Sequence, residues 1–246
     1  MVLDLVVGEW RIPWSCRVYR GKDTPSPAQL GLRWVAALPK GLRRAFKILV
    51  LADTAFGRVE FLQRIRPLKL HAIAGVRYDR QLEDGRHLFK LHQPGQPVRL
   101  AGLKFPVTIA GFYLKRDGES KRSQRYVLST RPLKACTIVG WGRHRWQIEG
   151  FFKTAKHRFG LHRFGQQTRL EMYRGLVLSL VAFLLAHWGD LAMDTSALPD
   201  WAVAAKVVFE AVLPAVAIAL VFRQLERQQP LLQRHGYQVQ IVRCKI

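Results

Sequence analysis

The stretch KILVLAD, Lys47–Asp53, decides the fold class. Its continuous apolar run is typical of a strand that is buried on both faces at the centre of an α/β sheet. The run ends at Asp53, and Thr54 can cap a following helix whose apolar residues recur at helical spacing. Asp53 therefore lies where a strand ends and a helix begins, which is where open α/β sheets place ligand groups. A simple capping or turn role for Asp53 is the alternative.

The elements around this strand predict a mixed α/β chain. Strands are expected at Val2–Val7 and Trp14–Arg20, and a helix at Ala28–Leu38. From residue 69 to 130 short strand-like runs alternate with Gly, Pro and charged turns, HLFKLH (His87–His92) among them. The chain from about Leu170 onward is mostly helical. These patterns indicate a sheet flanked by helices, a β-rich middle and a helical C-terminus.

The charge of the chain points to a polyanionic partner. Lys and Arg number 40 against 17 Asp and Glu in 246 residues, which gives a formal net charge of +23. Nucleic acid is the leading partner class and an anionic membrane surface is the second, while a basic solubilising surface is the simplest alternative. The three cysteines are scattered without metal-ligand spacing, which suits a reducing cytoplasm.

Two apolar stretches near the C-terminus raise the question of a membrane. They are Gly175–Trp188 and Ala211–Phe222. Both are shorter than the roughly 20 residues that a helix needs to span a bilayer. The sequence therefore predicts buried core helices and no stable membrane insertion.

The stretch RWQIEGFFKTAKHRFGL begins at Arg145 and predicts an amphipathic helix over Arg145–Phe159. At about 100° per residue, Glu149 lies roughly 40° and Lys156 roughly 20° from Arg145, so the three share one stripe. A neighbouring apolar stripe is wide enough to bury the helix. Its members are Ile148, Phe151, Phe152, Ala155 and Phe159. Glu149 is therefore either a functional carboxylate beside the buried face or an ordinary ion-pair partner of Arg145.

These two stretches together carry a resemblance to a known family. LVLADTAFG (Leu49–Gly57), followed far downstream by RWQIEGFFKTAKHRFGL, resembles the DDE transposases of bacterial insertion sequences. The resemblance is closest to the group with a Tyr-x2-Arg-x3-Glu-x6-Lys signature, whose spacing Arg145, Glu149 and Lys156 hold. The opening LVVGEWRIPWSCRVYRG (Leu5–Gly21) resembles the strand pair that follows the family's first acidic residue. The resemblance covers nearly the whole chain, least clearly in the β-rich middle.

The resemblance implies a fold and a site. The fold is a ribonuclease H-like mixed sheet flanked by helices, with the first part of the catalytic domain in residues 1–68. An inserted β-rich segment fills residues 69–130, and the remainder with the C-terminal helices fills 131–246. Asp53 and Glu149 would be the second and third carboxylates that hold two Mg²⁺ or Mn²⁺ ions. Arg145, Lys153 and Lys156 would contact DNA phosphates.

The resemblance also implies the setting of the reaction. Family members cut double-stranded DNA at transposon ends and join the freed 3′-hydroxyl to target DNA. The expected location is the bacterial cytoplasm, in association with the nucleoid, and a homodimer is compatible with the family.

Two positions depart from the family pattern. Gly142 stands where the signature has Tyr, with Trp141 beside it. The first catalytic Asp of the family precedes the hairpin that Val2–Arg20 resembles, and Asp4 alternates with leucines as an outward strand residue does. We therefore expect an N-terminally truncated copy that lacks the first carboxylate and binds DNA without cutting it. A non-catalytic basic nucleic-acid-binding remnant is the alternative, and a peripheral membrane protein is a third.

Overall fold

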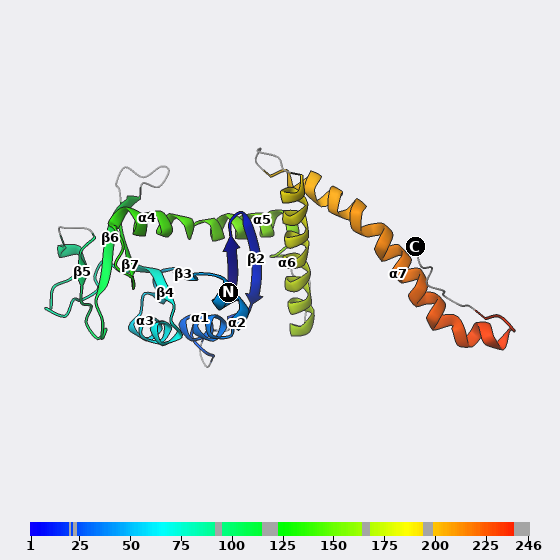
Figure 1. Ribbon diagram of the computed structural model, residues 1–246, viewed down its shortest axis with the longest axis horizontal. Coiled ribbons are helices and arrows are strands. Elements are labelled where there is room, and N and C mark those ends of the chain that lie inside the picture. Colours follow the sequence, from blue (N-terminus) through cyan, green and yellow to red (C-terminus); the bar gives the residue numbers. More distant parts are fainter. Residues whose placement is uncertain are drawn as a thin grey trace. The chain divides into compact units, whose positions relative to one another are not determined.

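The computed structural model describes residues 1–19, 21, 24–91, 95–114, 123–163, 168–193 and 199–238. The chain divides into two compact units. The first comprises Met1–Leu5 and Ile12–Thr154, and the second comprises Val6–Arg11 and Ala155–Ile246. Each unit is described by itself below, and Figure 1 shows their elements.

A five-stranded mixed sheet forms the centre of the first unit, in the order β3-β4-β7-β6-β5. The strands β3 and β4 run parallel, with Leu49 opposite His71, and the other neighbours pair antiparallel. The bounds are β3 Leu49–Ala52, β4 His71–Val76, β5 Pro97–Val98, β6 Val107–Leu114 and β7 Ser123–Ser129. The apolar run that ends at Asp53 was predicted as a central strand buried on both faces. Among the described strands it instead forms one edge of the sheet, paired in parallel with β4 alone, and three of its four residues are only half-buried.

Helices cover both faces of this sheet (Figure 1). Alternate strand residues point to opposite faces: Ala74 and Leu128 join a large core with α1 and α3, whereas Ile73 and Val127 join a smaller core with Ile138 of α4. The helices are α1 Pro27–Ala36, α2 Lys40–Ala45, α3 Val59–Ile65, α4 Ala135–His144 and α5 Gln147–Phe159, with short 3₁₀ helices η1 Thr54–Phe56, η2 Arg66–Leu68 and η3 Leu88–Lys90. The expected α/β class, with a mixed sheet flanked by helices, is confirmed.

A hairpin and two long helices complete the described elements. The hairpin consists of β1 Val2–Val7 and β2 Trp10–Cys16. In the second unit, α6 Arg169–Ala192 begins with a capping box of Thr168 and Glu171, and α7 Trp201–Arg234 begins at the cap Asp200. The two helices approach closely where Gly189 of α6 lies against Ala204 of α7, because a side chain at Gly189 would overlap α7.

The prediction that both C-terminal stretches are core helices is correct for one and wrong for the other. One side of α6 is buried, including Leu180 and Phe183, whereas Ala204 is the one buried residue of α7. The apolar run Ala211–Phe222 is exposed throughout, because α7 packs on α6 only near its start. Both helices are long and apolar enough to cross a membrane by length and composition, as are core helices of many soluble proteins.

Other boundaries also differ from the predicted ones. The second strand begins at Trp10 instead of Trp14, because a two-residue turn at Gly8 joins it to β1. The strand predicted from His87 is a short 3₁₀ helix anchored by the fully buried Leu88, and His92 lies outside the described residues. Residues 69–130 supply four strands to the same sheet as β3. The three-part organisation with divisions at residues 68 and 130 stays a prediction.

Candidate functional site

Asp53 lies directly after β3, at the carboxyl end of the strand, as its sequence position predicts. Its Oδ1 accepts a hydrogen bond from the Ala55 backbone N–H at 2.8 Å, which caps the short helix η1. The cap is therefore Asp53 and not Thr54, and the longer helix α3 starts only at Val59. The Asp53 side chain is exposed to solvent. It is thus both a capping residue and available to a ligand.

Two glycines hold the turn after Asp53 against strand β4. A Cβ atom on Gly57 would overlap the carbonyl oxygen of Gly75, and one on Gly75 would lie 2.7 Å from Thr54 Oγ1. Phe56 packs edge-on against Phe61 of α3, with ring centroids 5.2 Å apart. The turn is therefore held from the β4 side and from the α3 side, which restricts where the Asp53 carboxylate can lie.

A pocket of about 330 Å³ opens beside Asp53. It lies within the first unit, between the strand ends and helix α4. Three arginines, from three different parts of the chain, line it with Asp53: Arg77, Arg125 and Arg145. Aromatic side chains supply much of the rest, namely Tyr78, Phe112, Tyr126, Trp141 and Trp146. Burial raises the pKa of the Tyr126 hydroxyl, so that group stays neutral at physiological pH. The pocket thus combines one carboxylate, three cations and several flat apolar faces.

Glu149 is connected to this pocket through Arg145. The predicted helix does not begin at Arg145: α4 ends at His144, Arg145 is its C-cap, and α5 begins at Gln147. The i,i+4 contact nevertheless forms across the junction, with Arg145 Nη2 donating to Glu149 Oε1 at 3.3 Å. The Arg145 side chain is 24% exposed and that of Glu149 is 51% exposed. The predicted ion pair is present, and its arginine also lines the pocket that contains Asp53.

The rest of α5 follows the predicted amphipathic pattern. Phe151 and Ala155 are buried, while Lys153 and Lys156 are exposed. Lys153 is not among the residues that line the pocket. Lys156 lies about two turns beyond Glu149, in the part of α5 that belongs to the second unit. The structure therefore places Asp53 and Arg145 on one pocket, pairs Arg145 with Glu149, and leaves the two lysines on the solvent side of the helix.

The carboxylates in the described residues do not by themselves form the expected metal site. No group of three His, Cys, Asp or Glu residues that could hold a metal ion occurs in the described part of the chain. One oxygen of Asp53 is engaged by a backbone N–H and one of Glu149 by Arg145. Asp4 lies on β1 between Leu3 and Leu5, which pack on the large core, so its side chain points to the other face of the strand. Two carboxylates have the right chemistry for Mg²⁺ but supply too few oxygen ligands for two ions.

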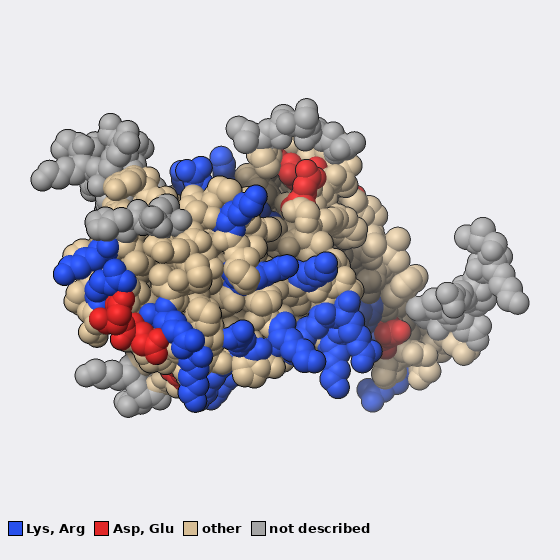
Figure 2. Space-filling model, turned by 60° about the vertical axis from the view of Figure 1, so that its left-hand side comes forward, with Lys and Arg blue, Asp and Glu red and all other residues tan. Residues whose placement is uncertain are grey.

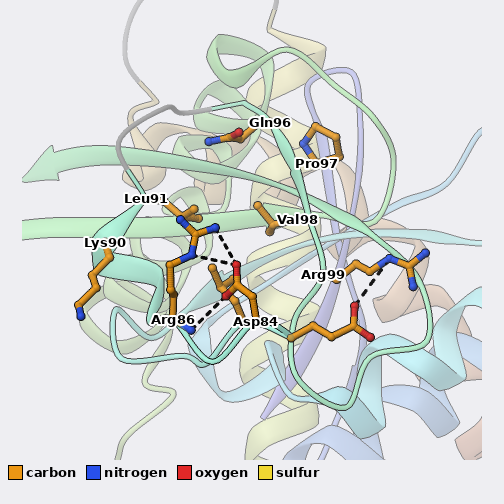
Figure 3. Close-up of a pocket in the computed structure, with 10 residues that line it drawn as sticks. Asp84, Arg86, Lys90, Leu91, Gln96, Pro97, Val98 and Arg99 are labelled. Atoms are coloured by element: carbon orange, nitrogen blue, oxygen red, sulfur yellow. Dashed lines mark hydrogen bonds and ion pairs between the residues drawn. The ribbon is translucent and has the colours of Figure 1, made fainter.

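The surface charge favours a polyanion, whereas a second, larger pocket in the described part of the chain does not. Figure 2 shows Lys and Arg in broad groups on one face, with few Asp and Glu among them. The larger pocket, of about 650 Å³, is drawn in Figure 3. There Arg86 pairs with Asp84 at 2.7 Å and Arg99 with Glu83 at 3.8 Å, so acidic neighbours balance most of its positive charge. Two arginines of the smaller pocket are also paired, Arg77 with Asp79 at 2.6 Å and Arg145 with Glu149 at 3.3 Å. The smaller pocket is nevertheless the better candidate site, because it lies at the carboxyl ends of β3 and β4 and contains Asp53.

Arg77 and Tyr78 line the pocket but were not predicted as site residues. Both directly follow β4, which is the parallel neighbour of β3. Their position directly after a strand could have indicated this role, because the carboxyl ends of parallel strands lie at the same edge of a sheet. Arg125 lies on β7 at the end of the basic run KRSQR, Lys121–Arg125, whose first two residues lie outside the described part.

The sequence around these residues matches a known protein family. A search of curated proteins gives no match. The family model described as "Transposase DDE domain" matches residues 33–185, which is more than half of the chain and includes Asp53, the pocket and Glu149. The chain belongs to the transposase DDE domain family.

Proposed function

We propose that the chain binds double-stranded DNA at the pocket beside Asp53, in the DNA cleavage and strand-transfer chemistry of transposition. The observation that carries this proposal is that Asp53 and Arg145 line one pocket while Arg145 holds Glu149. Membership of the transposase DDE domain family supports DNA as the substrate and the cytoplasm, at the nucleoid, as the location.

The charges of the pocket fit a phosphodiester. Arg77, Arg125 and Arg145 line the pocket together with Asp53, and a planar guanidinium can donate two parallel hydrogen bonds to one phosphate. Arg77 already donates two such bonds to Asp79, at 2.6 and 3.0 Å, which a phosphate would replace. Lys153 and Lys156 extend positive charge along the exposed side of α5. Each phosphate that these groups neutralise releases counterions, which makes binding strong at low salt and weak at high salt.

Asp53 and Glu149 are proposed as two of the carboxylates that hold Mg²⁺ or Mn²⁺ in the family's reaction. Bound divalent ions activate the attacking oxygen and stabilise the leaving oxygen in phosphodiester chemistry. A third carboxylate is needed beyond these two, and the ion pair with Arg145 links Glu149 to the pocket. We therefore expect the chain alone to bind DNA without cutting it, so that a purely DNA-binding role is the second candidate.

Binding is tested by the salt dependence of fluorescence anisotropy with a labelled DNA duplex of about 30 base pairs. The Arg145→Ala variant should weaken binding roughly tenfold and lower the salt slope by about one unit, because one phosphate contact is lost. Arg64→Ala is the matched control, since Arg64 forms the same type of exposed i,i+4 pair with Glu60 outside the pocket. Equal effects of both variants would exclude the pocket as the DNA site.

Cleavage is tested with supercoiled plasmid and Mg²⁺ or Mn²⁺. The purified chain should leave the plasmid intact. Metal-dependent nicking that disappears in Asp53→Ala would show that the chain assembles a complete catalytic site, and would exclude the purely binding role. If the wild-type chain did not bind the DNA duplex in the anisotropy measurement, by contrast, the proposed function itself would be overturned.

A further inference from the structure

Two of the three arginines that line the pocket beside Asp53 already hold a carboxylate of the chain itself. Arg145 donates to Glu149 at 3.3 Å. Arg77 donates two hydrogen bonds to Asp79, from Nε to Oδ1 at 3.0 Å and from Nη2 to Oδ2 at 2.6 Å. This parallel, two-bond arrangement is the one that guanidinium groups form with carboxylates and phosphates alike. Asp79 therefore occupies the donors of Arg77 that a phosphate would use.

The backbone holds Asp79 beside Arg77. Both belong to one turn after β4, closed by a hydrogen bond from the Arg80 N–H to the Arg77 carbonyl oxygen at 3.2 Å. His87 Nδ1 donates to the Asp79 carbonyl oxygen at 2.8 Å, and the Leu88 N–H donates to the carbonyl oxygen of Arg80 at 2.9 Å. None of these three bonds uses the Asp79 carboxylate. A substitution that removes only its charge should therefore keep the turn.

The Asp79 carboxylate opposes a phosphate at Arg77. The hydrogen bonds from Arg77 lower the pKa of Asp79, so its carboxylate stays ionised at neutral pH. A phosphate that binds Arg77 must displace this negative group and approach against its charge. The side chains of Arg77 and Asp79 are 72% and 40% exposed, and ion pairs as exposed as this one are weak. A DNA phosphate can therefore exchange with Asp79, but the exchange lowers the affinity for DNA.

We propose that Asp79 is an autoinhibitory residue of the pocket, which occupies on Arg77 the place of a DNA phosphate and thereby weakens the binding of DNA. The inference rests on the proposed function, because the phosphate at Arg77 is taken to belong to DNA. Removal of the Asp79 carboxylate is thus expected to increase DNA binding, whereas removal of a residue that contacts DNA decreases it.

The DNA affinity of the Asp79→Asn variant tests the proposal, measured by fluorescence anisotropy with the same labelled duplex. This variant should bind DNA about threefold more tightly than the wild-type chain, as expected for the loss of an exposed competing ion pair. Asp84→Asn is the matched control, because Asp84 forms the same type of pair with Arg86, two residues away, in the larger pocket (Figure 3). Both variants change the net charge equally, so a general charge effect would appear in both.

The Arg77→Gln background shows whether the gain in affinity acts through Arg77. In that background Asp79→Asn should tighten binding no more than Asp84→Asn does. Equal gains of the two variants in the wild-type background, or an excess gain that persists in Arg77→Gln, would overturn the proposal. Loss of the fold in Asp79→Asn, measured by circular dichroism, would do the same, because the carboxylate would then serve the stability of the turn.

The same measurement separates this inference from the proposed function. A wild-type chain that does not bind the duplex would overturn the proposed function. A wild-type chain that binds the duplex, together with an Asp79→Asn variant that gains no more than the control, would overturn the role of Asp79 alone.

Discussion

The sheet of the first unit and helix α7 of the second contain equally apolar sequences in opposite environments. LVLA in β3 and IALVF in α7 have nearly the same composition. The strand lies at the edge of the sheet beside β4 and is half-buried, with helices over both faces of the sheet, while the α7 residues are exposed to solvent. Apolar composition therefore indicates that burial would stabilise a segment, but it does not indicate which surface covers that segment.

Glycines allow close backbone approach in both units, with different consequences. In the first unit Gly57 and Gly75 bring the turn after Asp53 against β4, and so define the position of a site residue. In the second unit Gly189 lets α7 approach α6, and no site residue lies there. Close backbone contact positions a site residue in the first unit, and in the second it allows two helices to pack together.

The largest expected effect is in the core of the first unit. Phe61 is 1% exposed and packs against Phe56, so Phe61→Ala should lower the free energy of unfolding by about 3–5 kcal/mol. Ile218→Ala, in the exposed run of α7, should change it by less than about 0.5 kcal/mol. Urea denaturation compares the two. Similar losses would mean that α7 is buried in solution on its Ile218 side.

A smaller effect is expected at the glycine contact beside Asp53. Gly57→Ala should cost about 1–3 kcal/mol, because the new methyl group overlaps the Gly75 carbonyl and separates the turn from β4. Gly111→Ala is the control, since its Cβ would meet the Tyr126 ring at an ordinary 3.5 Å. Urea denaturation measures both. A Gly57→Ala protein as stable as the control would show that the turn is not held against the strand.

The smallest effect should be the pH dependence of the second unit. His187 is buried among Trp10, Phe183 and Trp201, and its Nε2 accepts a hydrogen bond from the Arg11 backbone N–H at 3.1 Å. Burial lowers the pKa of His187 from its ordinary value of 6.5, although the backbone carbonyl of Glu9 and, less strongly, Asp190 oppose this. The folded chain then binds fewer protons than the unfolded chain just below pH 6.5.

Stability should therefore fall as the pH drops below 6.5, by at most about 1.4 kcal/mol per pH unit for one proton. Hydrogen exchange of the α6 amides between pH 7.5 and 5.5 measures the loss. His187→Gln should remove most of this slope, and an unchanged slope in that variant would assign the pH dependence to another group.

Parts of the site could be predicted from sequence because they depend on local geometry. The end of the buried strand at Asp53 and the i,i+4 spacing of Arg145 and Glu149 are set by strand and helix periodicity. Arg77 and Tyr78 were missed because their place beside Asp53 depends on the pairing of β4 with β3, two strands separated by α3 in the chain. The break between α4 and α5 was also missed, since Trp141–Trp146 carries no proline to mark it.

The sequence by itself determined the α/β class, the basic charge and the two stretches that carry the family signature. The class and the two stretches follow from local periodicity within short segments, and the charge follows from the composition of the chain. None of these features depends on how the segments pack together. The tertiary structure decided which residues share the pocket with Asp53, that Arg145 connects Glu149 to it, and that α6 buries one face while α7 remains exposed. Those outcomes depend on contacts between segments far apart in the chain. The free energy gained by burying an apolar surface depends on which other surface is available to cover it.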